Sequence, residues 1–387
     1  MTEERVVGVL NWIKKETVLT IATILAVISM FFITPDRQYI DYIDVKTLVI
    51  LFCFMAVVAG LTDIGAFAWL ADRMLCRVKS IRSLVSVLVM LCFFFSMLIT
   101  NDVALITFVP LTIVVLDTLD KEIKDKWMVP IVVLQTVAAN MGSMLTPVGN
   151  PQNLYLYRIS GMEFTSFISN MLPFTGIALG LLIVFILVFD SRAKNYDKAG
   201  TGSGQLSVHS SHKMVIIHKE KLILYLALCI PLFLTVLRCL DYKILFVIIL
   251  LGVGIFDRKV FTKVDYSLLF TFVAFFIFIG NMGRIEAFSS LLSDVIKGRE
   301  VITAALSSQI ISNVPAALLL SGFTSDYKSL IIGTNIGGLG TLIASMASLI
   351  SYKLITRENP HIKGKYMIMF TWVNIVFLVV MLVRSCM

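Results

Sequence analysis

Charged residues are scarce in this 387-residue chain, where they make up 15% of the total against 58% for hydrophobic residues. Soluble domains contain about 45–50% apolar residues, so this composition excludes an ordinary soluble fold. The six cysteines lack the spacing of a zinc site, and no Walker A, nucleophile-elbow or metalloprotease motif occurs. We therefore expect neither an enzyme nor a cofactor, apart from a coupling ion.

Apolar runs of near-membrane length recur from one end of the chain to the other. They predict an all-α, polytopic membrane protein with about 10–11 transmembrane helices, embedded in the lipid bilayer. The net charge of +8 comes from Lys and Arg in short clusters between these runs. Such clusters set topology, so we expect no nucleic-acid partner.

The distribution of charge around the first span, residues 17–33, predicts the orientation of the chain. Basic Arg5, Lys14 and Lys15 precede this span, and an acid-rich loop follows it. The positive-inside rule then puts the N-terminus in the cytoplasm. We expect the protein to lie in the cytoplasmic (inner) membrane.

Four segments are predicted along the chain. Residues 1–40 form an N-terminal leader helix, and residues 41–190 form the first of two inverted repeats. Residues 191–221, rich in Gly, Ser and Lys, form a cytoplasmic linker. Its His209, His212 and His218 are interpreted as part of a solvated loop rather than a metal site. Residues 222–387 form the second repeat.

Two stretches of polar and helix-breaking residues interrupt the apolar runs at corresponding places. Residues 138–153 read AANMGSMLTPVGNPQN, and residues 334–341 read TNIGGLGT. Both contain the pattern N-x-G-[S/G]-x-x-T. Broken backbone at membrane depth is tolerated where it lines a cavity or binds a ligand, so each repeat is predicted to contain a broken helix there.

A polar turn precedes each break. Thr100, Asn101 and Asp102 lie near the middle of residues 84–116, a run too long for one span. Two helices are expected to meet there, as a span with a half-helix or as a re-entrant hairpin. Ser312 and Asn313 hold the corresponding place in the second repeat. Paired discontinuities of this kind indicate a transport site near the middle of the membrane.

Two kinds of ligand suit such a site. Helix N-termini carry free N–H groups and favour an anion, whereas the amide oxygens of Asn101, Asn140, Asn313 and Asn335 suit Na⁺. Any one of these residues could instead serve helix packing. The candidate binding residues are Thr100, Asn101, Asp102, Asn140, Gly142, Ser143, Thr146, Asn150, Ser312, Asn313, Thr334, Asn335, Gly337 and Thr341.

Two ionisable residues near these segments have alternative interpretations. An acid within a span is a functional candidate, so Asp102 could ligate Na⁺ or carry a proton. It could also cap the helix that starts at the turn. Arg284 could hold an anion, pair with Glu286, or lie at the membrane interface.

The chain resembles the ion transporter superfamily of arsenite permeases, D-type Na⁺/H⁺ antiporters, citrate transporters and divalent-anion:sodium symporters. The resemblance lies in LITNDVAL at residues 98–105, GSMLTPVGNPQN at 142–153 and SNVPA at 312–316, and is greatest to the arsenite-permease and citrate-transporter branch. It implies inverted repeats, each with a re-entrant hairpin and a broken helix, in a homodimer with an elevator-like moving part. It also implies that the hairpin tips bind ion and substrate.

One difference from that superfamily bears on the substrate. Sodium-coupled dicarboxylate members show Ser-Asn-Thr at both tips, whereas this chain has Thr-Asn-Asp and Ser-Asn-Val. A charged Asp102 would repel a dianion, which argues against a dicarboxylate substrate and against coupling to Na⁺ alone.

These observations predict a secondary active transporter of a small anion, such as an inorganic or metalloid oxyanion or a carboxylate, coupled to H⁺ or Na⁺. Three alternatives stay open. They are a Na⁺/H⁺ antiporter that uses Asp102, an anion channel, and a membrane subunit whose partner supplies the chemistry.

Overall fold

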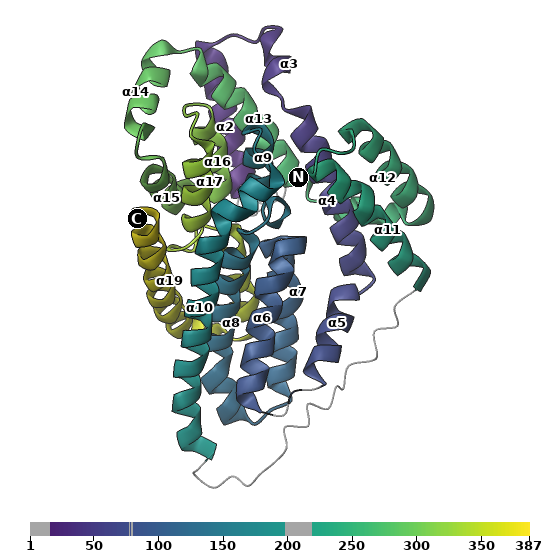
Figure 1. The fold of residues 1–387 in the computed structure, drawn as a ribbon, viewed down its shortest axis with the longest axis vertical. Coiled ribbons are helices and arrows are strands. Elements are labelled where there is room, and N and C mark those ends of the chain that lie inside the picture. The colour runs from purple at the N-terminus through teal and green to yellow at the C-terminus, as the bar shows by residue number, and fades with distance from the viewer. Residues whose placement is uncertain (1–15, 77, 79, 198–218) are drawn as a thin grey trace, which may run out of the picture.

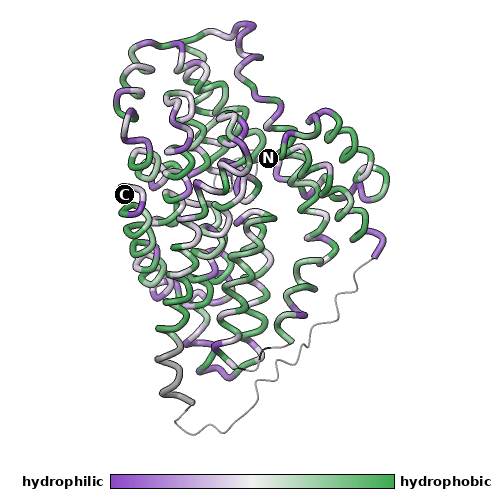
Figure 2. The backbone as a smooth tube through the Cα atoms, in the orientation of Figure 1, coloured by the Kyte–Doolittle hydropathy of each residue, from purple (hydrophilic) through white to green (hydrophobic). Residues whose placement is uncertain are grey.

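Helices account for the regular structure of this chain. The computed structural model describes residues 16–76, 78, 80–197 and 219–387, and no strand occurs within these ranges. Five helical segments are long and apolar enough to cross a membrane: Val45–Asp63, Ile81–Ile99, Phe164–Phe189, Tyr266–Gly283 and Pro360–Ser385. Three shorter helices are also apolar, and Figure 2 shows hydrophobic residues along most of the long helices. The fold is that of an all-α, polytopic membrane protein, as the sequence predicts.

Among the described residues, the first part of the chain contains nine α-helices and one 3₁₀ turn. In order they are α2 (Thr17–Phe32), α3 (Gln38–Tyr42), α4 (Val45–Asp63), α5 (Ala66–Leu75), α6 (Ile81–Ile99), α7 (Asn101–Asp117), α8 (Lys121–Ser143), η1 (Pro147–Gly149), α9 (Pro151–Ile159) and α10 (Phe164–Asp197).

The second part has a similar order of α-helices after one additional helix, α11, but its 3₁₀ turns lie at other places. It consists of α11 (Lys219–Val236), α12 (Tyr242–Phe256), η2 (Arg258–Lys263), α13 (Tyr266–Gly283), α14 (Glu286–Ile296), α15 (Glu300–Ile311), α16 (Asn313–Ser321), α17 (Tyr327–Ile336), α18 (Met346–Glu358), η3 (Pro360–Ile362) and α19 (Lys363–Ser385).

The two parts pack against each other in a reciprocal manner. Helix α2 of the first part packs on α13 of the second, and α12 of the second packs on α4 of the first. In the same way, α18 packs on α7 and α9 packs on α16. Such exchanged contacts are what two related repeats facing each other would make. The division at residues 41–190 and 222–387, and the inversion of the repeats, stay predictions.

The helices form two sets. The outer group contains α2–α5 and α11–α14. The hairpin group contains α6–α10 and α15–α19. Within it, α6 packs on α7 and α8, and α15 packs on α16 and α17 in the same way. In Figure 1, α6, α7 and α8 lie side by side and extend lower in the view than α2, α4 and α13.

Several boundaries differ from the predicted ones. The charged residues 121–126 belong to α8 rather than to a loop, because Asp120 begins a helix that continues into the apolar segment. Likewise, residues 191–197 continue α10, and residues 219–221 begin α11. The rest of the predicted linker, with its three histidines, lies outside the described residues, as do Arg5, Lys14 and Lys15.

Candidate functional site

The tips of the two hairpins have the same unusual backbone conformation. Thr100, between α6 and α7, has φ 74° and ψ 151°, and Ser312, between α15 and α16, has φ 74° and ψ 155°. A positive φ strains any residue with a side chain, and β-branched threonine most of all. Backbone strain at two equivalent positions indicates that the conformation of the tips has a functional role. The turn at residues 100–102 therefore joins two helices, as predicted.

Each broken helix is tied to the hairpin of its own part by an equivalent threonine. The hydroxyl of Thr146 donates to the carbonyl of Met97, and that of Thr341 donates to the carbonyl of Gln309 at 3.2 Å. Met97 and Gln309 each lie three residues before a tip. The same hydroxyls accept hydrogen bonds from backbone N–H groups three residues further on, those of Gly149 and Ala344.

Two glycines let the broken helices approach the hairpins closely. A Cβ added to Gly142 would lie 2.6 Å from Ser96 Oγ and 2.0 Å from the Phe93 carbonyl oxygen. A Cβ added to Gly337 would lie 2.5 Å from Ser308 Oγ. Ser96 and Ser308 are each four residues before a tip. The glycines thus position the site and contribute no ligand atom through a side chain.

Asn140 joins the first broken helix to the start of α18. Its Oδ1 accepts hydrogen bonds from Asn101 Nδ2 at 2.9 Å and Ser345 Oγ at 3.0 Å. Its Nδ2 donates to Ser348 Oγ at 3.3 Å and to the Gly338 carbonyl at 3.4 Å. Ser345 is the N-cap residue of α18, so this amide holds the second helix break against the first.

Asn335 makes the equivalent connection in the other direction. Its Oδ1 accepts from Asn150 Nδ2 at 3.4 Å, and its Nδ2 donates to Asn153 Oδ1 at 2.6 Å. Asn150 is the N-cap residue of α9. Each broken helix therefore reaches the first residues of the half-helix that follows the opposite break.

These hydrogen bonds bring four helix starts into one buried cluster. Helices α7, α9, α16 and α18 begin at Asn101, Pro151, Asn313 and Met346. The Asn313 N–H donates to the Ala344 carbonyl at 2.9 Å, which ties the second tip to the second break. Asn101, Asn140, Asn150, Asn313 and Asn335 are each no more than 4% exposed. A cluster of helix N-termini favours negative charge.

Not every predicted residue offers a free ligand atom to this cluster. Thr334 Oγ1 donates to the Leu330 carbonyl at 2.9 Å, within its own helix. Ser143 Oγ donates to the Asn140 carbonyl and accepts from Asn150 Nδ2, both at 2.9 Å. Asn140 Oδ1 already accepts two hydrogen bonds, whereas the buried Oδ1 of Asn150 has no partner among the described residues. Of the amide oxygens in this cluster, that of Asn150 best suits an ion. Sodium binding itself stays a prediction.

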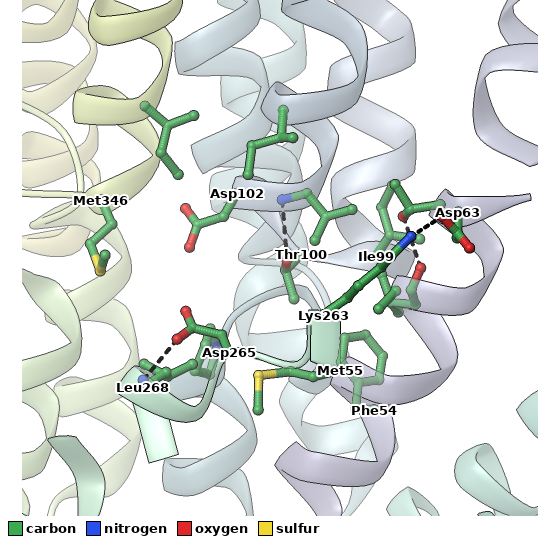
Figure 3. Close-up of a pocket in the computed structure, with 17 residues that line it drawn as sticks. Phe54, Met55, Asp63, Ile99, Thr100, Asp102, Lys263, Asp265, Leu268 and Met346 are labelled. Carbon is green, nitrogen blue, oxygen red and sulfur yellow. Dashed lines mark hydrogen bonds and ion pairs between the residues drawn. The ribbon is translucent and has the colours of Figure 1, made fainter. Parts of the chain in front are cut away.

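A cavity of about 470 Å³ lies beside the first tip, between the hairpin group and the outer group. Thr100 and Asp102 line one side with Met346 of α18, and α4 lines the other side with Lys263 and Asp265 (Figure 3). Most of the remaining lining is apolar. Lys263 Nζ bonds to Asp63 at its edge. The cavity therefore exposes the first tip to a space between the two groups.

The structure corrects the interpretation of two charged residues. Thr100 caps α7, because its Oγ1 accepts from the Val103 N–H at 3.5 Å, so Asp102 does not serve as the cap. Arg284 donates to Asp36 Oδ2 at 2.7 Å and to the Tyr42 hydroxyl at 3.1 Å, and pairs with Asp36 instead of Glu286.

Sequence reasoning missed several residues of the site. These residues are Asn153, Ser345 and Ser348, which lie just beyond the aligned patterns. Ser345 is the N-cap residue of α18, and Asn153 and Ser348 each lie three residues after an N-cap residue. Alignment of the segments that follow the two motifs would have found them, since Asn150 and Ser345 are both N-cap residues. No local signal marked Asp265, which reaches the cavity through the packing of α13.

A helical membrane fold with paired hairpins and paired helix breaks, joined by buried amides, is the arrangement expected of a membrane transport protein. The chain belongs to the citrate transporter family, whose model matches residues 6–325. This finding confirms the resemblance to the ion transporter superfamily.

Named relatives agree with this assignment. An uncharacterised transporter of Methanocaldococcus jannaschii is 32% identical over 356 residues, 90% of this chain and 91% of that protein. An inner membrane protein of Escherichia coli is 31% identical over 340 residues, 86% of each chain. A silicon efflux transporter of Oryza sativa is 27% identical over 190 residues, 48% of this chain and 38% of that protein.

Proposed function

We propose that this protein is a secondary active transporter that moves a small anion across the inner membrane, coupled to H⁺ or Na⁺. The observation that carries the proposal is the reciprocal pair of amide contacts, from Asn140 to the start of α18 and from Asn335 to the start of α9. Four helix N-termini linked in one cluster supply N–H donors and positive potential for an anion without a lysine. As part of this proposal, the protein is a transporter rather than an enzyme and takes no cofactor apart from a coupling ion.

The movement proposed for transport is an elevator. Contacts within the hairpin group join both tips and both breaks into one body, and the outer group would be the static part. We also propose a cytoplasmic N-terminus, which the charge distribution around the first span supports. We further propose a homodimer, which the resemblance to the superfamily supports. The substrate class includes inorganic and metalloid oxyanions and carboxylates. The silicon efflux relative makes silicon oxyacids a natural first test.

The experiment is thermal stability of the purified protein against a panel of anions, followed by flux into liposomes. A ligand stabilises the folded state by mass action, by about 2.7 kcal/mol at one hundred times its Kd. We expect one anion to raise the Tm, to be carried against its gradient when an ion gradient is imposed, and to lose both effects in Asn140→Ala. No flux of any anion under either gradient would refute the proposal.

A Na⁺/H⁺ antiporter is the second candidate, favoured by the carboxylate of Asp102 at the first tip. The same liposomes distinguish it, because an antiporter would move Na⁺ against a pH gradient without added anion. Saturable, uphill flux would exclude a channel.

A further inference from the structure

The cavity beside the first tip contains charged groups from both sides of a boundary that an elevator would move. Asp102 belongs to the hairpin group. Asp265 immediately precedes α13 of the outer group, and it faces the same space as Asp102 (Figure 3). These two carboxylates therefore share the cavity only while the tip lies against this part of the outer group.

The charges that line the cavity do not balance. They are the carboxylates of Asp63, Asp102 and Asp265 and the ammonium group of Lys263. Lys263 is bonded to Asp63. Among the residues that line the cavity, Asp102 and Asp265 are thus left without a cation.

Hydrogen bonding leaves both carboxylates with free acceptor capacity. One oxygen of Asp265 accepts from the Leu268 N–H at 3.0 Å and so caps α13. The buried Oδ1 of Asp102 has no hydrogen-bond partner within the described part of the chain. Around them the wall is formed by apolar side chains such as Phe54, Val103 and Leu268. The buried oxygen of Asp102 in such surroundings requires a cation or a proton. Asp265 is exposed to the cavity and supplies a second carboxylate there.

We propose that Asp102 and Asp265 together bind a cation that holds the protein in the conformation described here, and that this site is complete only in this conformation. The proposal rests on the proposed transport function, because it concerns the movement of the hairpin group, and it assigns control of that movement to one pair of residues. Because one carboxylate lies on each group, a bound cation holds the first tip against the outer group. Its release would then free the hairpin group to move, which links cation binding to conformation by reciprocity.

The ligand of this site is a small monovalent cation, either a proton or Na⁺. Hard cations are coordinated by several oxygen atoms, and Thr100 is a neutral hydroxyl of the same tip that lines this space. A proton needs only the carboxylates. The experiment therefore contains an arm for each cation.

The experiment measures Tm of the purified, full-length protein without any anion. One arm varies NaCl at fixed pH, with choline chloride holding ionic strength constant, and the other varies pH without Na⁺. The variants are Asp102→Asn and Asp265→Asn. Asparagine caps a helix about as well as aspartate, so α13 should still form in the second variant. Asp326→Asn is the matched control, because Asp326 caps α17 in the same way and does not line the cavity.

We expect one cation to shift the Tm of the wild type and of Asp326→Asn, and we expect the same shift to be lost in both Asp102→Asn and Asp265→Asn. A shift that persists in either of these two variants would overturn the paired site, and so would a wild-type Tm that responds to neither cation. Anion flux is scored separately. Flux with an unaltered cation response in Asp265→Asn would leave the transport function standing and remove this site.

Discussion

Asn140 and Asn335 occupy equivalent positions in two broken helices, and each bonds to the N-cap residue of the half-helix that follows the opposite break. Neither break is therefore complete within its own repeat. This exchange explains why both repeats keep an asparagine at the same place in the pattern N-x-G-[S/G]-x-x-T. It also makes the two breaks one structural unit, because loss of either amide leaves partners in both repeats without a hydrogen bond.

Replacing either amide should therefore reduce both stability and transport. Asn140→Ala and Asn335→Ala each leave buried polar groups unpaired, and we expect about 1–3 kcal/mol of destabilisation for each. Thermal unfolding and liposome flux provide the two measurements. Asn374→Ala, a buried asparagine of α19 outside this cluster, is the control, and it should lower Tm without abolishing flux. Wild-type flux in both site variants would show that the amides only pack the helices.

The glycines of the two breaks should be far less tolerant than those of α10. Gly142→Ala would place its Cβ 2.0 Å from the Phe93 carbonyl oxygen, and Gly337→Ala would place it 2.5 Å from Ser308 Oγ. Overpacking of this kind costs about 1–3 kcal/mol or more. Gly176 and Gly180 have nothing within 4 Å of an added Cβ. Their alanine variants should gain up to about 1 kcal/mol, since alanine favours the helix. Equal Tm values for the two pairs would contradict the close approach.

At the hairpin tips, glycine should stabilise the protein relative to alanine, because the tip residues have a strained backbone. Ser312 has a positive φ and provides no capping hydrogen bond, so Ser312→Gly should remove strain at little loss. We expect it to be more stable than Ser312→Ala by about 1 kcal/mol. Relative to the wild type, Thr100→Gly should gain less than Ser312→Gly, because it also removes the hydroxyl that caps α7. The two Gly–Ala pairs can be compared by thermal unfolding, and a Ser312→Ala variant as stable as Ser312→Gly would argue against strain.

The sequence is sufficient to predict the hairpins and the breaks, because polar and helix-breaking residues within apolar runs leave few structural alternatives. Thr100 and Ser312 lie at helix junctions as predicted. The pattern could not show which partner each amide selects. Asn140 and Ser345 are distant in sequence, and their contact arises from how the repeats pack. Asp265 was missed for the same reason, since a helix cap in a loop gives no sign that it faces a cavity. The ends of α8 and α10 were misjudged because charged residues can continue a helix beyond its apolar part.

A further contact between the two groups should control their relative position. Arg158 of α9 bonds to Asp44 and to the hydroxyl of Thr47, at the start of α4. The side chains are partly buried, with 27% of Arg158 and 14% of Asp44 exposed. Arg158 belongs to the hairpin group and Asp44 to the outer group, so an elevator movement must break this ion pair.

Asp44→Asn keeps a capping residue for α4 and removes the charge, so α4 itself should be retained. A charge-assisted hydrogen bond with partial burial contributes about 1.5–3 kcal/mol, which is enough to change the population of two conformations by about tenfold or more. Loss of the pair should disfavour the conformation described here. A thiol introduced at Thr62, which lines the cavity, should then react more slowly than in the wild-type background. Asp241→Asn, which alters an N-cap of α12 away from this contact, should leave the labelling rate unchanged. An unaltered rate in Asp44→Asn would mean that the ion pair stabilises both conformations equally or that the two groups do not separate at this point.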